Sequence, residues 1–170
     1  VVSEFNDPDP YAMRRIILAP CSPFSVEADV MRHTAELGRK FGVPIHTHLC
    51  ETVDEEEYCL ATYGKRPLDV MADWGWIGDN VFYAHGIWFN DAELDVLAET
   101  GTGVAHCPGS NMRLGSGISR IREMLDRGVR IGIAVDGSAS NDTSDMLGEV
   151  RNAMLLQRVK YGPDAMSARE

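Results

Sequence analysis

Five short apolar runs in this 170-residue chain each end in polar side chains of the kinds that enzymes use for catalysis. A loop and then a helix-like segment follow each run. In a parallel β/α protein the carboxyl ends of the strands meet on one face, where the loops that follow them converge. The pattern therefore predicts an active site assembled from several strands. The residues at the run ends are Cys21 and Ser22, His48 and Glu51, His85, His106, and Asp136.

The alternation of apolar runs with helical segments predicts an α/β fold, with a parallel sheet and helices outside it. Two architectures satisfy this pattern: an open doubly wound sheet and part of a (β/α)8 barrel. A complete barrel typically needs about 250 residues, so the chain could supply only the last five units of one. The predicted strands are 16–19, 43–49, 81–85, 103–106 and 129–136.

Cap-like residues mark where several of the predicted helices begin. Thr52 with Glu55 and Asn90 with Glu93 have the spacing of capping boxes. Thr143 or Ser144 is the expected cap of the longest helix, which runs to about Tyr161. The chain begins at Val1 without an initiator Met and ends in Ser-Ala-Arg-Glu, after a helix start at Pro163. We therefore expect it to be a piece of a larger protein.

Composition narrows the class of partner. The net charge of −10 disfavours nucleic acid, because an acidic surface repels phosphate backbones. No apolar run approaches the roughly 18 residues needed to span a membrane, and there is no basic-then-apolar leader. The four cysteines form no C-x-x-C pair, so we expect reduced thiols in a cytoplasmic protein. A neutral small molecule is the expected partner.

No single polar residue at the strand ends indicates a metal centre, but together these residues do. His46 and His48 are two apart on a strand and point to the same face, with Glu51 just beyond them. Alone, the pair could equally be two buried core histidines. A carboxylate such as Asp136 at the end of a buried strand is costly unless it is paired or bound to metal. Imidazole with carboxylate is a ligand set typical of a zinc-like divalent ion.

Other motifs are weaker. The segment His106-Cys-Pro-Gly-Ser-Asn111 is predicted to be a rigid polar turn, and we favour a tight βα loop there over catalysis by His106. Gly101-Thr-Gly103 precedes its strand, and Gly115-Ser-Gly117 lacks a third glycine. Neither pair fits a dinucleotide-binding fingerprint.

The motifs HTHLCE, YAHG, AHCPGSN and AVDGSASND, with APCSPFSV and HCPGSNMRLGSGI, resemble the amidohydrolase superfamily. They are most similar to its aminohydrolase subgroup, which deaminates purine and triazine rings and includes 8-oxoguanine deaminases and hydroxyatrazine aminohydrolases. The resemblance covers about residues 12–160. It implies that residues 1–170 are the C-terminal part of a metal-dependent TIM-type (β/α)8 barrel domain, with strands matching the fourth to the eighth.

The resemblance also implies roles for single residues. His48 and Asp136 would bind one divalent metal ion, expected to be zinc, and Asp136 would also accept a proton from the attacking water. Glu51 would shuttle protons to a ring nitrogen, and His85 would position or polarise the water. Four residues would line the substrate pocket or support it: Cys21, Trp88, Ser110 and Asn111.

The implied activity is hydrolytic deamination of an aminopurine or related heterocycle, 8-oxoguanine-like, by a homo-oligomer. An s-triazine amino- or chlorohydrolase of the same superfamily is the first alternative, and a non-catalytic α/β binding module is the second. The family site also uses an H-x-H pair from the first barrel strand. The only H-x-H pair here, His46 and His48, lies on the strand matching the fifth. We therefore expect the isolated chain to be inactive.

Overall fold

The computed structural model describes residues 1–170 and has an α/β fold around one sheet of four parallel strands. The strands lie side by side in chain order, β1-β2-β3-β4, and neighbours pair in parallel. The predicted fold class, a parallel sheet alternating with helices, is therefore present. The strands are β1 Ile45–Leu49, β2 Val81–His85, β3 Gly103–His106 and β4 Ile131–Ile133.

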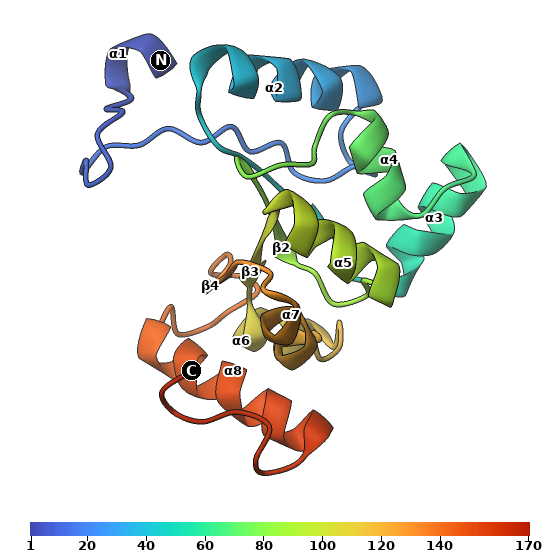
Figure 1. The fold of residues 1–170 in the computed structure, drawn as a ribbon, viewed down its shortest axis with the longest axis vertical. Coiled ribbons are helices and arrows are strands. Elements are labelled where there is room, and N and C mark those ends of the chain that lie inside the picture. Colours follow the sequence, from blue (N-terminus) through green and yellow to red (C-terminus); the bar gives the residue numbers. More distant parts are fainter.

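The helices form an arc around the sheet, from α2 at one end to α8 at the other (Figure 1). Their bounds are α1 Val2–Phe5, α2 Ala28–Phe41, α3 Val53–Tyr63, α4 Pro67–Asp73, α5 Asp91–Thr100, α6 Pro108–Leu114, α7 Ile121–Arg127 and α8 Met146–Tyr161. None of them is both long and apolar enough to cross a membrane.

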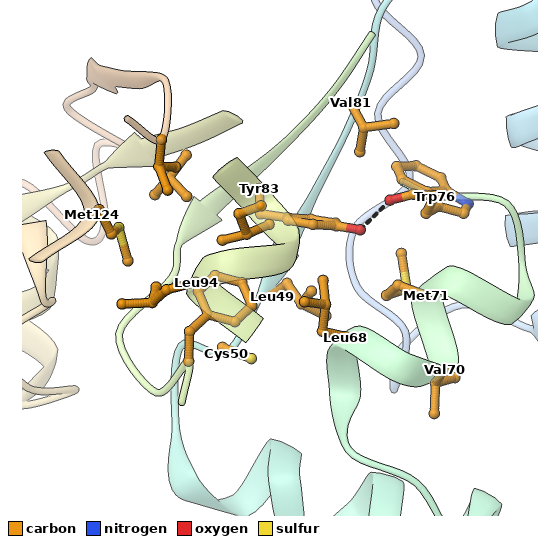
Figure 2. Close-up of a cluster of buried hydrophobic side chains, with 14 of the residues drawn as sticks. Leu49, Cys50, Leu68, Val70, Met71, Trp76, Val81, Tyr83, Leu94 and Met124 are labelled. Atoms are coloured by element: carbon orange, nitrogen blue, oxygen red, sulfur yellow. Dashed lines mark hydrogen bonds between the residues drawn. The ribbon is translucent and has the colours of Figure 1, made fainter. Parts of the chain in front are cut away.

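The core lies between the sheet and this arc of helices. In β1, Ile45, Thr47 and Leu49 are buried, whereas His46 and His48 are only half-buried. Alternation along the strand thus separates a face that packs against helices from a face that carries the histidines. On the packed face, the buried Tyr83 hydroxyl donates a hydrogen bond to the Trp76 carbonyl (Figure 2). This bond ties the core to the loop that leads into β2.

Residues 16–19 do not form the predicted strand. Only Leu18 among them forms a β-bridge, to Ile45. The Leu18 amide donates to the Pro44 carbonyl and the His46 amide donates to the Leu18 carbonyl. The next amide donor on this side of the ladder would belong to residue 20, which is proline and has no N–H. The segment therefore runs beside β1 without extending the sheet to five strands.

The last strand is also shorter than the predicted 129–136. β4 pairs with β3 only from Ile131 to Ile133, opposite Val104 to His106. The Ala134 amide still donates to the His106 carbonyl, but the chain after His106 turns into α6. Residues 135 and 136 therefore have no strand to pair with, and Asp136 lies past the end of the ladder.

Four local predictions need correction. No helix begins at Pro163, because α8, the last helix, ends at Tyr161 and only turns follow it. Residues 108–114 form the helix α6, not a turn. Thr52 precedes α3 but makes no side-chain cap, and the Glu55 carboxylate accepts from the Glu51 amide and not from the Thr52 amide. α8 is capped by Asp145, which accepts from the Leu147 amide, and not by Thr143 or Ser144. The capping box of Asn90 and Glu93 is present as predicted.

Candidate active site

His48 lies on the half-buried face of β1, near its carboxyl end. Its Nδ1 is 2.6 Å from the Cys21 carbonyl oxygen. A carbonyl can only accept, so Nδ1 carries the proton and Nε2 keeps its lone pair free. This orientation, with one ring nitrogen donating to a carbonyl, is typical of a histidine that binds metal through the other.

His46 lies on the same face, two residues further from the strand end. Its ring stacks on Phe82 with centroids 4.6 Å apart, and its Nδ1 is 3.4 Å from the Phe82 carbonyl oxygen. Burial lowers its pKa, with the nearby histidines adding to the effect. His46 therefore packs beneath the site as an aromatic side chain.

His85 ends β2 and is almost fully buried. Strand alternation would place it with Tyr83, on the face that packs against helices, since the register pairs it with Leu49. Its ring instead stacks against His48, with centroids 5.4 Å apart. The backbone φ of 70° at His85 accounts for this change of face, because a left-handed residue breaks the alternation. Its Nε2 is buried and has no hydrogen-bond partner.

Asp136 follows β4, and its backbone is also left-handed, with φ 66°. Its Oδ2 accepts from the Ser110 hydroxyl at 2.6 Å and lies 3.9 Å from His85 Nε2. Burial alone would raise the pKa of Asp136. The hydrogen bonds from Ser110 and the Gly137 amide, together with the two histidines, outweigh burial and lower it. Asp136 is therefore held as a carboxylate.

Glu51 reaches the same place from the loop after β1. Its Oε2 is 3.6 Å from His85 Nε2, and its side chain is 21% exposed. The Ser116 hydroxyl donates to its Oε1 at 3.4 Å. Two carboxylates thus lie beside one imidazole nitrogen, and both side chains are partly exposed.

The residues fit a divalent ion. His48, His85 and Asp136 each offer one ligand atom, and these atoms lie within 4.8 Å of one another. The orphaned, buried Nε2 of His85 is the clearest sign, because such an atom normally has a partner. Two imidazoles and a carboxylate are ligands that zinc accepts, with a position left for water. The four side chains predicted to converge, these three and Glu51, do converge.

The predicted substrate-binding residues divide into two groups. Trp88 is 41% exposed and donates its indole N–H to the Ser116 carbonyl at 3.1 Å, and Cys21 is exposed. Ser110 and Asn111 are fully buried, and their side chains bond to Asp136 and His85. These two can support the site but do not face solvent, where a substrate would arrive.

His106 does not join the cluster of His48, His85, Glu51 and Asp136. It is fully buried, neither ring nitrogen has a hydrogen-bond partner, and burial lowers its pKa to about 4. Sequence reasoning missed Ser116, which contacts Glu51 and Trp88. Its only signal was its place between Gly115 and Gly117, a pair that the sequence analysis set aside because it does not fit a dinucleotide-binding fingerprint.

A model of the amidohydrolase family matches residues 3–170. The chain belongs to this family. It is 47% identical over 167 residues to the 8-oxoguanine deaminase of Pseudomonas aeruginosa. This match covers 98% of this chain and 37% of that protein. It is 43% identical over 160 residues to the hydroxydechloroatrazine ethylaminohydrolase of Pseudomonas sp. strain ADP, covering 94% of this chain and 33% of that protein.

Among solved amidohydrolase structures, an adenosine deaminase from Xanthomonas campestris with bound zinc matches with a TM-score of 0.85 and 32% identity. The match covers 90% of this chain and 34% of the other. The chain therefore spans about a third of the length of the relatives it matches. The predictions of family and of a partial barrel of this family are confirmed.

Proposed function

We propose that the protein containing this chain is a metal-dependent amidohydrolase that removes the amino group from an aminopurine-like heterocycle. Residues 1–170 would form the C-terminal part of its barrel domain. The observation that carries the proposal is the convergence of His48, His85 and Asp136 on one point, with Glu51 beside them. The 47% identity to an 8-oxoguanine deaminase supports the choice of a purine-like ring with an exocyclic amine.

His48 and Asp136 would hold the ion, and His85 offers a third nitrogen at the same point. Zinc is the proposed ion, because its preferred ligands are present and a zinc-bound structure of the family matches. When bound, a divalent ion supplies Lewis-acid activation of water and of the ring carbon. The first-strand histidines of the family pattern would complete the ligand set in the full-length protein.

The proposed chemistry exchanges one leaving group for water. The water oxygen bonds to the amino-bearing ring carbon, and Asp136 accepts a proton from that water as a carboxylate. Glu51, in its protonated form, delivers a proton to the adjacent ring nitrogen, so that negative charge does not accumulate on the ring. Asp136 then returns its proton to the exocyclic amine, the carbon–nitrogen bond breaks, and ammonia leaves. The second proton of the water passes from the new hydroxyl to Glu51, which leaves a ring carbonyl and restores the acid.

The hydrogen bonds of each carboxylate fit its proposed task, since the two side chains are about equally exposed, at 18% and 21%. Asp136 accepts a short hydrogen bond from Ser110, as suits a group that keeps one position. Glu51 accepts a single, long side-chain hydrogen bond, from Ser116. It can therefore turn between water and substrate. Trp88 offers an exposed aromatic surface on which a planar ring could stack.

The second candidate function is hydrolysis of an s-triazine with loss of an amine or chloride. The 43% identity to a hydroxydechloroatrazine ethylaminohydrolase favours it. The two candidates share the site and differ only in ring and leaving group. A third candidate, a binding module without metal, predicts that the four converging side chains have no catalytic use.

A product assay on the full-length, zinc-loaded protein separates the three. Ammonia, ethylamine and chloride are measured with 8-oxoguanine, hydroxyatrazine, an ethylamino-s-triazine and a chloro-s-triazine as substrates. We expect ammonia from 8-oxoguanine at a rate at least tenfold above that of any other product. A faster release of ethylamine or chloride would establish the triazine candidate, and no release of any product would leave the binding module.

A homo-oligomer in the cytoplasm remains a prediction for the full-length protein. The four cysteines are all free thiols, as expected for a reducing compartment. Light scattering on the purified protein tests the oligomeric state, and fractionation of cells tests the location.

A further inference from the structure

Two adjacent residues in the first turn of α6 bond to two different members of the proposed centre. The Asn111 Oδ1 is 2.8 Å from Nδ1 of His85, and the Ser110 hydroxyl is 2.6 Å from Oδ2 of Asp136. Both side chains are fully buried. One turn of helix therefore contacts residues that come from β2 and from the loop after β4.

A residue of another helix, α8, holds this first turn of α6 in place. α6 has no side-chain N-cap of its own, and the buried carboxylate of Glu149 on α8 accepts from the Gly109 amide at 2.7 Å. The second oxygen of Glu149 accepts from Nδ2 of Asn141 at 3.0 Å. A Cβ at position 109 would lie 2.3 Å from a Glu149 oxygen, so only glycine allows this approach. The first turn of α6 is thus held in place by the buried side chain of Glu149.

We propose that Asn111 is a positioning residue that fixes the tautomer and ring orientation of His85. The amide oxygen can only accept, so Nδ1 of His85 carries the proton and Nε2 keeps its lone pair. Nε2 is the atom beside Glu51 and Asp136, at 3.6 and 3.9 Å from their nearest oxygens. In this tautomer Nε2 can accept a proton from water or bind an ion, and the opposite tautomer can do neither.

In the orientation present, Nδ2 of Asn111 is buried without a hydrogen-bond partner. In the opposite orientation Nδ2 would donate to Nδ1 of His85, and the proton would lie on Nε2, whose nearest oxygens, at 3.6 and 3.9 Å, are beyond hydrogen-bond distance. Each orientation therefore leaves one buried nitrogen unpaired, and only the first leaves Nε2 able to bind an ion. Ser110 holds Asp136 in a similar way, because its hydroxyl donates to Oδ2, the oxygen that lies 3.9 Å from Nε2 of His85.

The inference rests on the proposed function only for its kinetic consequence. The tautomer of His85 can be read in the full-length, metal-loaded protein by NMR of ¹⁵N-labelled histidine, with the His85 signals assigned by their loss in His85→Gln. We expect the Nδ1–H form in the wild type. An Nε2–H form would overturn the inference, whether or not the protein deaminates anything.

Two variants test the kinetic consequence. Asn111→Leu removes the acceptor, and we expect kcat to fall about 10- to 100-fold with KM within about twofold, as for other hydrogen-bond partners of catalytic groups. Asn111→Asp keeps an oxygen at the same place and should retain the Nδ1–H tautomer and most of kcat. Met112→Ala is the matched control, because Met112 is on the same helix and 47% exposed.

The possible results for the Asn111 variants and for the wild-type tautomer separate a positioning role from a substrate contact. A rise in KM with an unchanged kcat in Asn111→Leu would make Asn111 a substrate contact and overturn the positioning role. If Asn111→Leu does not fold, the wild-type tautomer and the Asn111→Asp variant still decide. If the wild type shows the Nδ1–H form but no deamination of any ring, the proposed function fails and the positioning of His85 stands.

Discussion

The Nε2 of His85 lies 3.9 Å from the Oδ2 of Asp136, although His85 ends β2, Asp136 follows β4, and strand β3 lies between these two strands. Both residues have left-handed backbones, with φ 70° and 66°. Each such residue costs of order 1–3 kcal/mol and persists only where the surroundings impose it. Two of the four left-handed non-glycine residues are thus the two side chains brought together, and the other two are Cys50 and Ser144.

The two carboxylates should separate metal binding from proton transfer. In the full-length protein, Asp136→Ala is expected to lose bound metal and lower kcat by at least about 10³-fold, because it removes a ligand and a proton acceptor together. Glu51→Gln should keep its metal and lower kcat about 10²- to 10⁴-fold, because it removes only the shuttle. Metal analysis and initial rates on the same samples check both. Equal metal loss in the two variants, or near-normal turnover of Glu51→Gln, would contradict this division.

Trp88 should act on substrate binding more than on chemistry. We expect Trp88→Leu to raise KM about 2- to 10-fold with little change in kcat, since stacking of an aromatic pair contributes about 0.5–1.5 kcal/mol. Trp88→Phe keeps a stacking face and should show a smaller rise. Because the indole N–H of Trp88 donates to the Ser116 carbonyl, a fall in kcat in both variants would instead point to a disturbed Ser116 and Glu51.

Glu55 should make stability fall as the pH rises. Burial raises its pKa from 4.5 to about 7, and hydrogen bonds from the Cys50 and Glu51 amides only partly oppose this. A carboxyl with a raised folded pKa stabilises the fold fully below pH 4.5, and this stability is lost as the pH rises through 7. The loss amounts to about 3 kcal/mol.

Glu55→Gln removes this titration and keeps an oxygen that can accept from the Glu51 amide. We expect its urea midpoint to exceed that of the wild type at pH 8 and to approach it near pH 5. Glu57→Gln, at an exposed position on the same helix, serves as the control. The same gap between Glu55→Gln and wild type at both pH values would show that Glu55 does not titrate as described.

The isolated 170-residue chain should associate with itself and release no ammonia. The outer edge of β4 pairs with no strand, and an apolar groove of about 440 Å³ lies beside it, lined by residues such as Ile131, Ile133 and Val150. At roughly 25 cal/mol per Å² of apolar surface, covering such a face favours association. Size-exclusion chromatography with an ammonia assay tests this. A stable, zinc-loaded, active monomer would contradict it.

The bounds of two strands could be predicted from their apolar runs alone. The bounds of two other predicted strands, 16–19 and 129–136, depend on what the neighbouring segment allows to pair. Strands 81–85 and 103–106 were predicted with the bounds that the structure has. The run at 16–19 forms only one bridge because Pro20 removes the next donor, and β4 stops where β3 turns into α6. α6 itself had a signal that the sequence analysis did not use, since Pro108 begins it and Gly115 ends it.

The polar residues at the strand ends were predictable because strand ends converge, but their contacts were not. Sequence reasoning expected Ser110 and Asn111 either to line the substrate pocket or to support it, and both side chains are buried, bonded to Asp136 and His85. These contacts depend on the helix α6 and on the carboxylate of Glu149, which is 40 residues away from Gly109 in the chain. A single sequence does not reveal such a contact between distant segments.

We propose that a single divalent ion at His48 and Asp136 makes the full-length protein a deaminase. The most direct test strips the protein of metal with a chelator, adds zinc in steps, and measures ammonia release from 8-oxoguanine at each step. We predict no release without metal and a linear rise that levels off at one equivalent per chain, with Asp136→Ala flat throughout. Release at the full rate from the stripped protein, or a wild type that stays inactive after one equivalent of zinc on every aminopurine tried, would contradict the account.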